Sequence, residues 1–237
     1  MTAVLSLKRL FYLVARSRSA GFRVLNGRPP LDRRIVGGED AAPGEFPYQV
    51  RNEIKGTPRI KTWGGVANHA LLENRRISHL WCIHLERRLG RDCRTLPSLV
   101  STPFVFSCTV SPIALPAEGE ELDAGTMVVI SGWGYLSEEG PNAKFLQKVT
   151  VPVYDQNECV LAYKTSNGIT DQMFCAGVKE GGKDACQRDS GGPVVTDDKL
   201  YGIVSWGLGC GGRGYPGVYA KVSSMKAFIA KETGLMK

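Results

Sequence analysis

The sequence of 237 residues lacks two features that would place it in a familiar class at once. No run approaches the ~18 apolar residues of a membrane-spanning helix, so no membrane association is predicted. Histidine occurs only three times, at His69, His79 and His84, and none of the three stands in a setting typical of a ligand or a catalytic base. We therefore predict neither a metal site nor a cofactor.

Two segments of the chain are rich in Lys and Arg and contain few acidic residues. The net charge of +7 arises in residues 1–34, with eight Lys and Arg against one acid, and in residues 51–110, with ten against four. Residues 111–237 are net acidic, and no basic patch interleaved with aromatic side chains occurs there, so nucleic-acid binding is not predicted. One alternative stays open, in which the two basic segments bind an anionic polymer.

Residues 1–34 are predicted to be a leader or activation segment. Their best apolar run, residues 10–15, is shorter than the ~7–15 residues of a secretory signal core, and the Arg- and Ser-rich composition fits a transit peptide equally well. The pair Arg33-Arg34 directly precedes Ile-Val-Gly-Gly at 35–38. We predict cleavage after Arg34 and one domain over residues 35–237.

Short apolar runs with 28 glycines and 13 prolines favour an all-β barrel or sandwich. Strands are predicted near residues 127–130, 145–153, 200–206 and 217–222, and helical spacing of apolar residues predicts a short helix over 224–233. Residues 51–110 lack this pattern. The abrupt change at Arg51 and the return near Ser111 favour translation from another frame, or a retained intron, over gradual divergence.

Seven cysteines suggest an oxidising compartment, and the odd count leaves at least one without a partner in the chain. Four of them lie in the well-patterned second half: Cys159, Cys175, Cys186 and Cys210. The sequence does not assign partners to the other three, Cys82, Cys93 and Cys108.

The stretch 184–195, Asp-Ala-Cys-Gln-Arg-Asp-Ser-Gly-Gly-Pro-Val-Val, has the composition of a tight turn that holds a nucleophilic serine, Ser190. Ile-Val-Gly-Gly at 35–38, Ser-Gly-Trp-Gly at 131–134 and Ser-Trp-Gly at 205–207 accompany it in order. Together these motifs resemble the trypsin-like branch of the chymotrypsin family of serine endopeptidases. The resemblance covers residues 34–50 and about 111–237.

The resemblance implies an all-β fold of two antiparallel six-stranded barrels with a short C-terminal helix, the first barrel being incomplete. It also implies an extracellular monomer, made as a zymogen, that hydrolyses proteins and peptides after Lys or Arg and is bound by protease inhibitors.

Site residues follow from the same resemblance. Asp184 would select Lys or Arg side chains by charge, between pocket walls at Gly207 and Gly217, because glycine leaves room for a long side chain. Ser205 and Trp206 would pair with the substrate backbone as a strand.

The resemblance also implies an activation switch and two disulfides. After cleavage, the new amine of Ile35 would pair with Asp189, and this buried ion pair would order the serine loop. The implied disulfides are Cys159–Cys175 and Cys186–Cys210.

The catalytic base is missing from the pattern. The family's Thr-Ala-Ala-His-Cys and Asp-Ile-Ala-Leu motifs are absent, none of the three histidines stands in a matching context, and neither Asp92 nor Asp123 has a claim to the aspartate role. The chain is therefore predicted to be inactive as written. The alternative is a non-catalytic protein that binds ligands through the retained Lys/Arg pocket.

Arg188 is a second departure, because the family has glycine at this position of the oxyanion hole. Two readings stay open. In the first, the arginine rotates or obstructs the backbone N–H; in the second, its side chain points along the leaving-group side and alters specificity.

Overall fold

A computed structural model describes residues 35–53, 62–66, 76–77, 98–99, 105–166 and 168–233. All of them lie in the unit Leu31–Lys237. The strands are β1 (Glu39–Asp40), β2 (Gln49–Glu53), β3 (Thr62–Val66), β4 (Arg76–Ile77), β5 (Ser98–Leu99), β6 (Met127–Gly132), β7 (Gln147–Pro152), β8 (Met173–Ala176), β9 (Pro193–Thr196), β10 (Lys199–Trp206) and β11 (Gly217–Lys221). The helices are α3 (Gln156–Ala162), the 3₁₀ helix η2 (Val222–Met225) and α4 (Lys226–Thr233).

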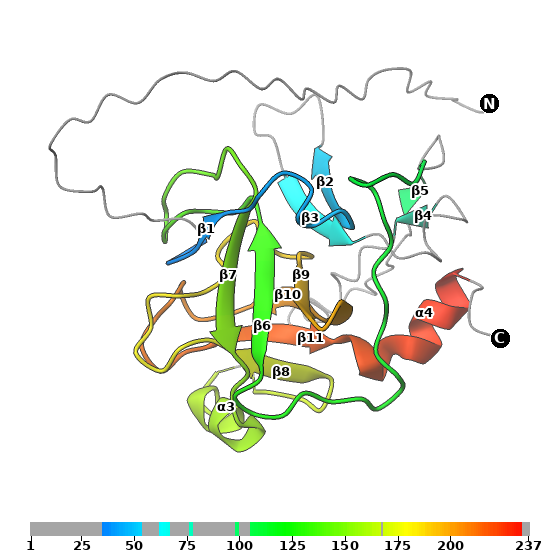
Figure 1. Ribbon diagram of the computed structural model, residues 1–237. Helices are drawn as coiled ribbons and strands as arrows, with labels where there is room; N and C mark the ends of the chain where they lie inside the picture. The colour runs from blue at the N-terminus through cyan, green and yellow to red at the C-terminus, as the bar shows by residue number, and fades with distance from the viewer. Residues whose placement is uncertain are drawn as a thin grey trace, which may run out of the picture. The chain divides into compact units, whose positions relative to one another are not determined.

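Antiparallel strands dominate the described part of the chain, as the sequence predicts (Figure 1). Seven strands form one sheet in the order β1-β7-β6-β9-β10-β11-β8, and β2-β3 and β4-β5 form two small sheets. The closed six-stranded barrels of the prediction are not confirmed, because the large sheet is open within the described residues. No helix in the described segments is long and apolar enough to cross a membrane.

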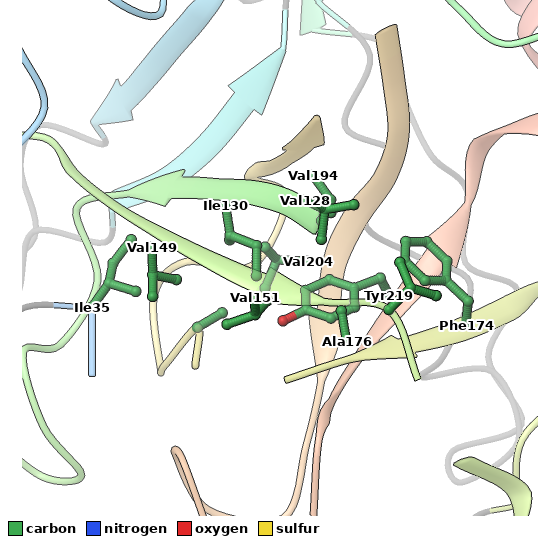
Figure 2. Close-up of a cluster of buried hydrophobic side chains, with 12 residues drawn as sticks. Ile35, Val128, Ile130, Val149, Val151, Phe174, Ala176, Val194, Val204 and Tyr219 are labelled. Carbon is green, nitrogen blue, oxygen red and sulfur yellow. The ribbon is translucent and has the colours of Figure 1, made fainter. Parts of the chain in front are cut away.

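The large sheet encloses an apolar core (Figure 2). Along β7, side chains alternate between buried and more exposed, as expected of a strand with one face on the core. The core cluster consists of Ile35, Val128, Ile130, Val149, Val151, Val153, Phe174, Ala176, Ala185, Val194, Val204 and Tyr219. Ile35, which follows the predicted cleavage site, and Ala185, which follows Asp184, are thus part of the core.

The C-terminal helix predicted over 224–233 is confirmed as α4, which begins at Lys226 after the short helix η2. Met225 and Ile229 pack in a second apolar cluster with Ile203 and Ala220 of the sheet. This packing buries Met225 and Ile229, whereas Phe228 of α4 is 36% exposed.

Helix α3 was not predicted, although its start carries a clear signal. The Asp155 side chain accepts hydrogen bonds from the backbone N–H groups of Asn157 and Glu158, which caps the helix. The helix buries only Cys159, so its apolar periodicity is weak, and the polar residues at its start look like a loop in the sequence.

The sequence break placed at Arg51 falls inside a strand. Strand β2 pairs with β3 from Gln49 opposite Val66 to Glu53 opposite Thr62, so Trp63-Gly64-Gly65 occupies the second strand of a hairpin. The Gln49 side chain also donates a 2.9 Å hydrogen bond to the carbonyl of Ser131 in β6. Regular pairing therefore continues past the point where the sequence pattern changes.

Candidate active site

Six of the predicted catalytic and substrate-binding residues line a single pocket of about 220 Å³. They come from the loop after β8, the serine turn before β9, the end of β10 and the start of β11. The six are Asp184, Ser190, Ser205, Trp206, Gly207 and Gly217. Motifs separated in sequence thus converge on one concave surface, as expected of a binding or catalytic site.

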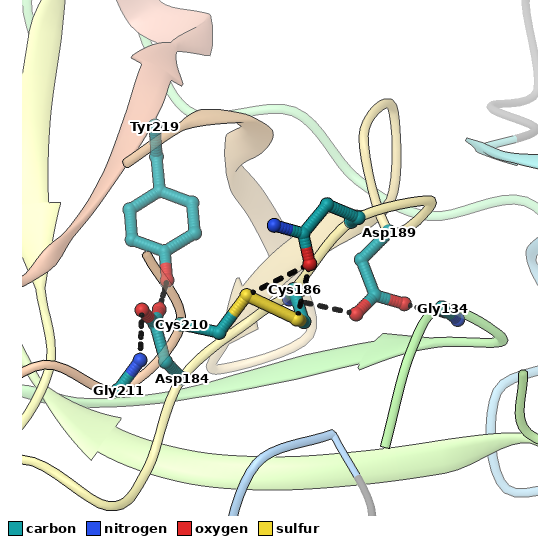
Figure 3. Close-up of a disulfide and its surroundings, with 8 residues drawn as sticks. Gly134, Asp184, Cys186, Asp189, Cys210, Gly211 and Tyr219 are labelled. Carbon is teal, nitrogen blue, oxygen red and sulfur yellow. Dashed lines mark hydrogen bonds between the residues drawn. A yellow bond between two sulfur atoms is a disulfide. The ribbon is translucent and has the colours of Figure 1, made fainter. Parts of the chain in front are cut away.

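Asp184 is the buried acid of this pocket, only 4% exposed. Its Oδ2 accepts a 2.9 Å hydrogen bond from the Gly211 N–H, and its Oδ1 lies 3.5 Å from the Tyr219 hydroxyl, which donates to it (Figure 3). Burial raises the pKa of the Asp184 carboxyl to about 7 despite these donors. A buried carboxylate with spare acceptor capacity favours a cationic guest.

The two predicted wall glycines play different parts. A Cβ at Gly217 would lie 2.6 Å from Asp184 Oδ1 and 2.4 Å from the Tyr219 hydroxyl, so a side chain there would press on the acid. A Cβ at Gly207 would meet nothing closer than 3.7 Å. Gly217 is required by the position of the acid, whereas Gly207 only keeps the pocket open.

Asp189 is fully buried and does not line the pocket. Its two carboxyl oxygens accept hydrogen bonds from the backbone N–H groups of Gly134, at 2.7 Å, and Cys186, at 3.0 Å (Figure 3). Burial raises the pKa of Asp189 to about 7, and the two hydrogen bonds oppose this rise. The carboxyl ties the serine turn to the loop that follows β6.

The residues that follow the predicted cleavage site, Ile35 and Val36, are packed against the segments that form the pocket. Ile35 is fully buried in the core cluster, and the carbonyl of Val36 accepts a 3.0 Å hydrogen bond from the Asp184 N–H. Ile35 has a φ of +26°, a strained value for a β-branched residue. Arg34 lies outside the described residues.

Both disulfides implied by the resemblance are present. Cys186–Cys210 joins two segments that line the pocket, and Cys159–Cys175 joins α3 to β8. Cys108 is an exposed free thiol. Cys82 and Cys93 lie outside the described residues.

Arg188 adopts a φ of +76°, the left-handed conformation that glycine normally provides. Its guanidinium carbon lies 5.0 Å from the centre of the Tyr135 ring, within cation–π range. The sequence identifies Arg188 as unusual at its position, but it does not predict the aromatic partner, Tyr135, which lies in the loop after β6.

The residues considered for the base and its aspartate partner, His69, His79, His84 and Asp92, lie outside the described residues. Asp123 is described, and it lines a separate pocket that does not contain Ser190. No group of His, Cys, Asp and Glu in the described residues could hold a metal ion.

Two tyrosines of the site were not anticipated. Tyr219 is buried beside Asp184, and Tyr163 packs edge-on against Trp206, with ring centres 4.8 Å apart. The Tyr163 hydroxyl also donates a 2.5 Å hydrogen bond to the carbonyl of Pro216, beside the pocket wall. Their only sequence signal is an aromatic residue in an otherwise ordinary apolar run.

The comparisons with known proteins agree with this geometry. A family model described as Trypsin matches residues 97–229. The chain is 37% identical to the vitellin-degrading protease of Bombyx mori over 231 residues, which cover 85% of this chain and 86% of that protein. The chain therefore belongs to the trypsin family of serine proteases, whose members act on protein or peptide substrates.

Other relatives match about half of the chain. Trypsin 5G1 of Aedes aegypti is 46% identical over 55% of this chain, and Trypsin-1 of Astacus astacus is 50% identical over 52%. These matches span about half of each relative, 49% and 53% of its length. A solved structure of neuropsin, a serine protease expressed in the limbic system of mouse brain, covers 82% of this chain and 97% of its own, with 27% identity and a TM-score of 0.68.

Proposed function

We propose that this chain is, by descent, a secreted trypsin-like endopeptidase that recognises Lys and Arg and is inactive or nearly so as written. The observation that carries the recognition step is a buried carboxyl, Asp184, in the same pocket as Ser190. A Lys or Arg side chain would donate charge-assisted hydrogen bonds to that carboxylate in a partly desolvated site. The two disulfides fit an oxidising compartment, which supports secretion.

Activation by cleavage after Arg34 is part of the proposal. In the uncut chain Asp189 is buried, and its raised pKa reflects the cost of holding a charge there. A new ammonium group at Ile35 would offset that cost, because a buried carboxylate is stabilised by a partner cation. The cut would also release Ile35 from its strained φ.

We expect the chain to bind substrate but not to catalyse the attack of Ser190 on the peptide bond. For Ser190 to attack a peptide carbonyl, its hydroxyl proton must pass to a base, and the family's histidine motif is absent. In subtilisin the loss of the base costs about 10⁶ in turnover, whereas one oxyanion donor costs about 10²–10³. The missing base therefore outweighs any effect of Arg188.

The experiment separates chemistry from binding. The full chain, cut at Arg34, is treated with a fluorophosphonate probe, and we expect no labelling of Ser190. Labelling that Ser190→Ala abolishes would show that a base exists and that the chain is a working protease.

The second candidate function is a non-catalytic protein that docks Lys- or Arg-bearing ligands in the intact pocket. Its test is p-aminobenzamidine, an aromatic amidine whose fluorescence reports entry into an apolar site. Saturable binding without labelling, lost in Asp184→Asn, supports the docking protein. Heparin retention that survives removal of residues 1–34 would instead favour binding of an anionic polymer by residues 51–110.

A further inference from the structure

Two hydrogen bonds fix the backbone of the Tyr135 loop beside Arg188. The Tyr135 N–H donates a 2.9 Å hydrogen bond to the carbonyl of Gln187, and the preceding Gly134 N–H donates to Asp189. The loop carrying the aromatic ring is thus fixed on both sides of Arg188. These backbone bonds bring the Tyr135 ring next to Arg188, and the guanidinium carbon lies 5.0 Å from the ring centre.

The charge of Arg188 is not neutralised by the described part of the chain. The ion pairs between described residues all join Lys to Glu, and none of them includes Arg188. A cation–π contact engages only one face of the guanidinium and leaves its in-plane N–H groups to donate. Those N–H groups form the fork that binds a carboxylate at two points.

The position of Arg188 relative to the pocket indicates which part of a bound peptide its guanidinium group would contact. Ser190 lines the pocket, but neither Arg188 nor Tyr135 does, although Arg188 lies only two residues away. Trp206 and Gly207 line the pocket from a different segment, the end of β10 and the loop after it. A peptide with its Lys or Arg in the pocket and its upstream backbone along β10 would extend its next residues past Ser190 toward Arg188.

We propose that Arg188 and Tyr135 form a subsite for an acidic side chain on the leaving-group side of the cleft. This subsite rests on the proposed function, since it presumes that a Lys or Arg side chain anchors the peptide at Asp184. It answers the question raised by an arginine in a glycine position: the left-handed backbone is retained, and the side chain adds selectivity. Tyr135 acts as the positioning residue and Arg188 as the binding residue.

The test measures binding, so it does not require turnover. Three peptides with an uncleavable bond after arginine carry Glu, Gln or Lys at the next position, and each displaces p-aminobenzamidine from the full chain cut at Arg34. We expect the Glu peptide to bind about tenfold more tightly than the Lys peptide at low salt, and the preference to shrink as salt is added.

Substitutions test whether the preference for the Glu peptide comes from the Arg188 side chain. Arg188→Gln keeps a side chain at the left-handed position and should bring the ratio close to one, whereas Arg213→Gln removes the same charge from an exposed loop residue and should leave it unchanged. Tyr135→Phe retains the ring and the preference, whereas Tyr135→Leu should reduce it. A purely structural role for Tyr135 would weaken all three peptides equally.

The outcomes separate the subsite from the pocket. Normal p-aminobenzamidine binding with no preference for Glu, or a preference that persists in Arg188→Gln, would overturn the subsite and leave the pocket intact. A preference for Glu that persists when p-aminobenzamidine fails to bind, measured by direct titration of labelled peptides, would contradict only the pocket. Absence of any peptide binding counts against both.

Discussion

Asp189 and Gly134, 55 residues apart in the sequence, are joined by a 2.7 Å hydrogen bond from the glycine N–H to the carboxyl Oδ1. A Cβ at Gly134 would lie 2.5–2.6 Å from the atoms of that carboxyl group. The turn that carries Ser190 and the loop after β6 are therefore fitted to each other through one buried acid. Both the pocket and the Arg188–Tyr135 pair depend on this fit.

Gly134→Ala should disturb the serine turn. The added methyl must displace a fully buried carboxyl, so we expect the free energy of unfolding to fall by about 1–3 kcal/mol and p-aminobenzamidine to bind more weakly. Urea unfolding and fluorescence titration measure the two effects. Gly212→Ala is the matched control, because a Cβ there meets nothing closer than 3.6 Å. Equal behaviour of the two variants would mean that the contact does not constrain the turn.

The pocket walls should respond unequally to a methyl group. Gly217→Ala places a carbon 2.6 Å from Asp184 Oδ1, so we expect the affinity for p-aminobenzamidine to fall by at least about tenfold. Gly207→Ala has room for its methyl and should fold with unchanged stability, although it narrows the cavity. Thermal unfolding compares the two folds. A Gly217→Ala variant with full affinity would place the amidine somewhere other than beside Asp184.

Removal of each disulfide should separate stability from binding. Cys186→Ala with Cys210→Ala opens a loop of 24 residues and should cost about 3 kcal/mol of stability as well as amidine affinity, because both cysteines line the pocket. Cys159→Ala with Cys175→Ala should lower stability similarly and leave affinity near normal in the folded protein. If both pairs changed affinity alike, the Cys186–Cys210 bridge would have no specific role at the pocket.

The sequence predicted the strands that carry apolar runs bounded by glycine-rich or polar segments, and the structure confirms them as β6, β7, β10 and β11. The resemblance to the trypsin-like family also led us to expect Asp184, Ser190 and the pocket walls in one site, and all of them line the same pocket. The sequence did not predict α3, whose seven residues bury only Cys159, or β8, whose four residues are all buried and show no alternation.

Contacts between segments that are far apart in the sequence could not be predicted from local patterns. The sequence around Tyr135 does not predict that its ring lies next to Arg188, because that contact depends on the geometry of two separate loops. The pairing of β2 with β3 was also unexpected, because residues 51–110 lack the strand pattern of the second half of the chain. Tertiary pairing can override weak local patterns.

Amidine binding should depend on pH through Asp184. The guest is a cation throughout the range, so it binds the ionised carboxylate, and the pKa of that carboxyl in the free protein is raised to about 7 by burial. Below about pH 7 the affinity should therefore fall close to tenfold per pH unit, and above that value it should level off. Fluorescence titrations between pH 5 and about 8.5 measure the curve, and Asp184→Asn should bind weakly with no inflection near 7. A flat profile in the unaltered chain would mean that the carboxylate is already ionised at pH 5, stabilised by water or donors that offset its burial.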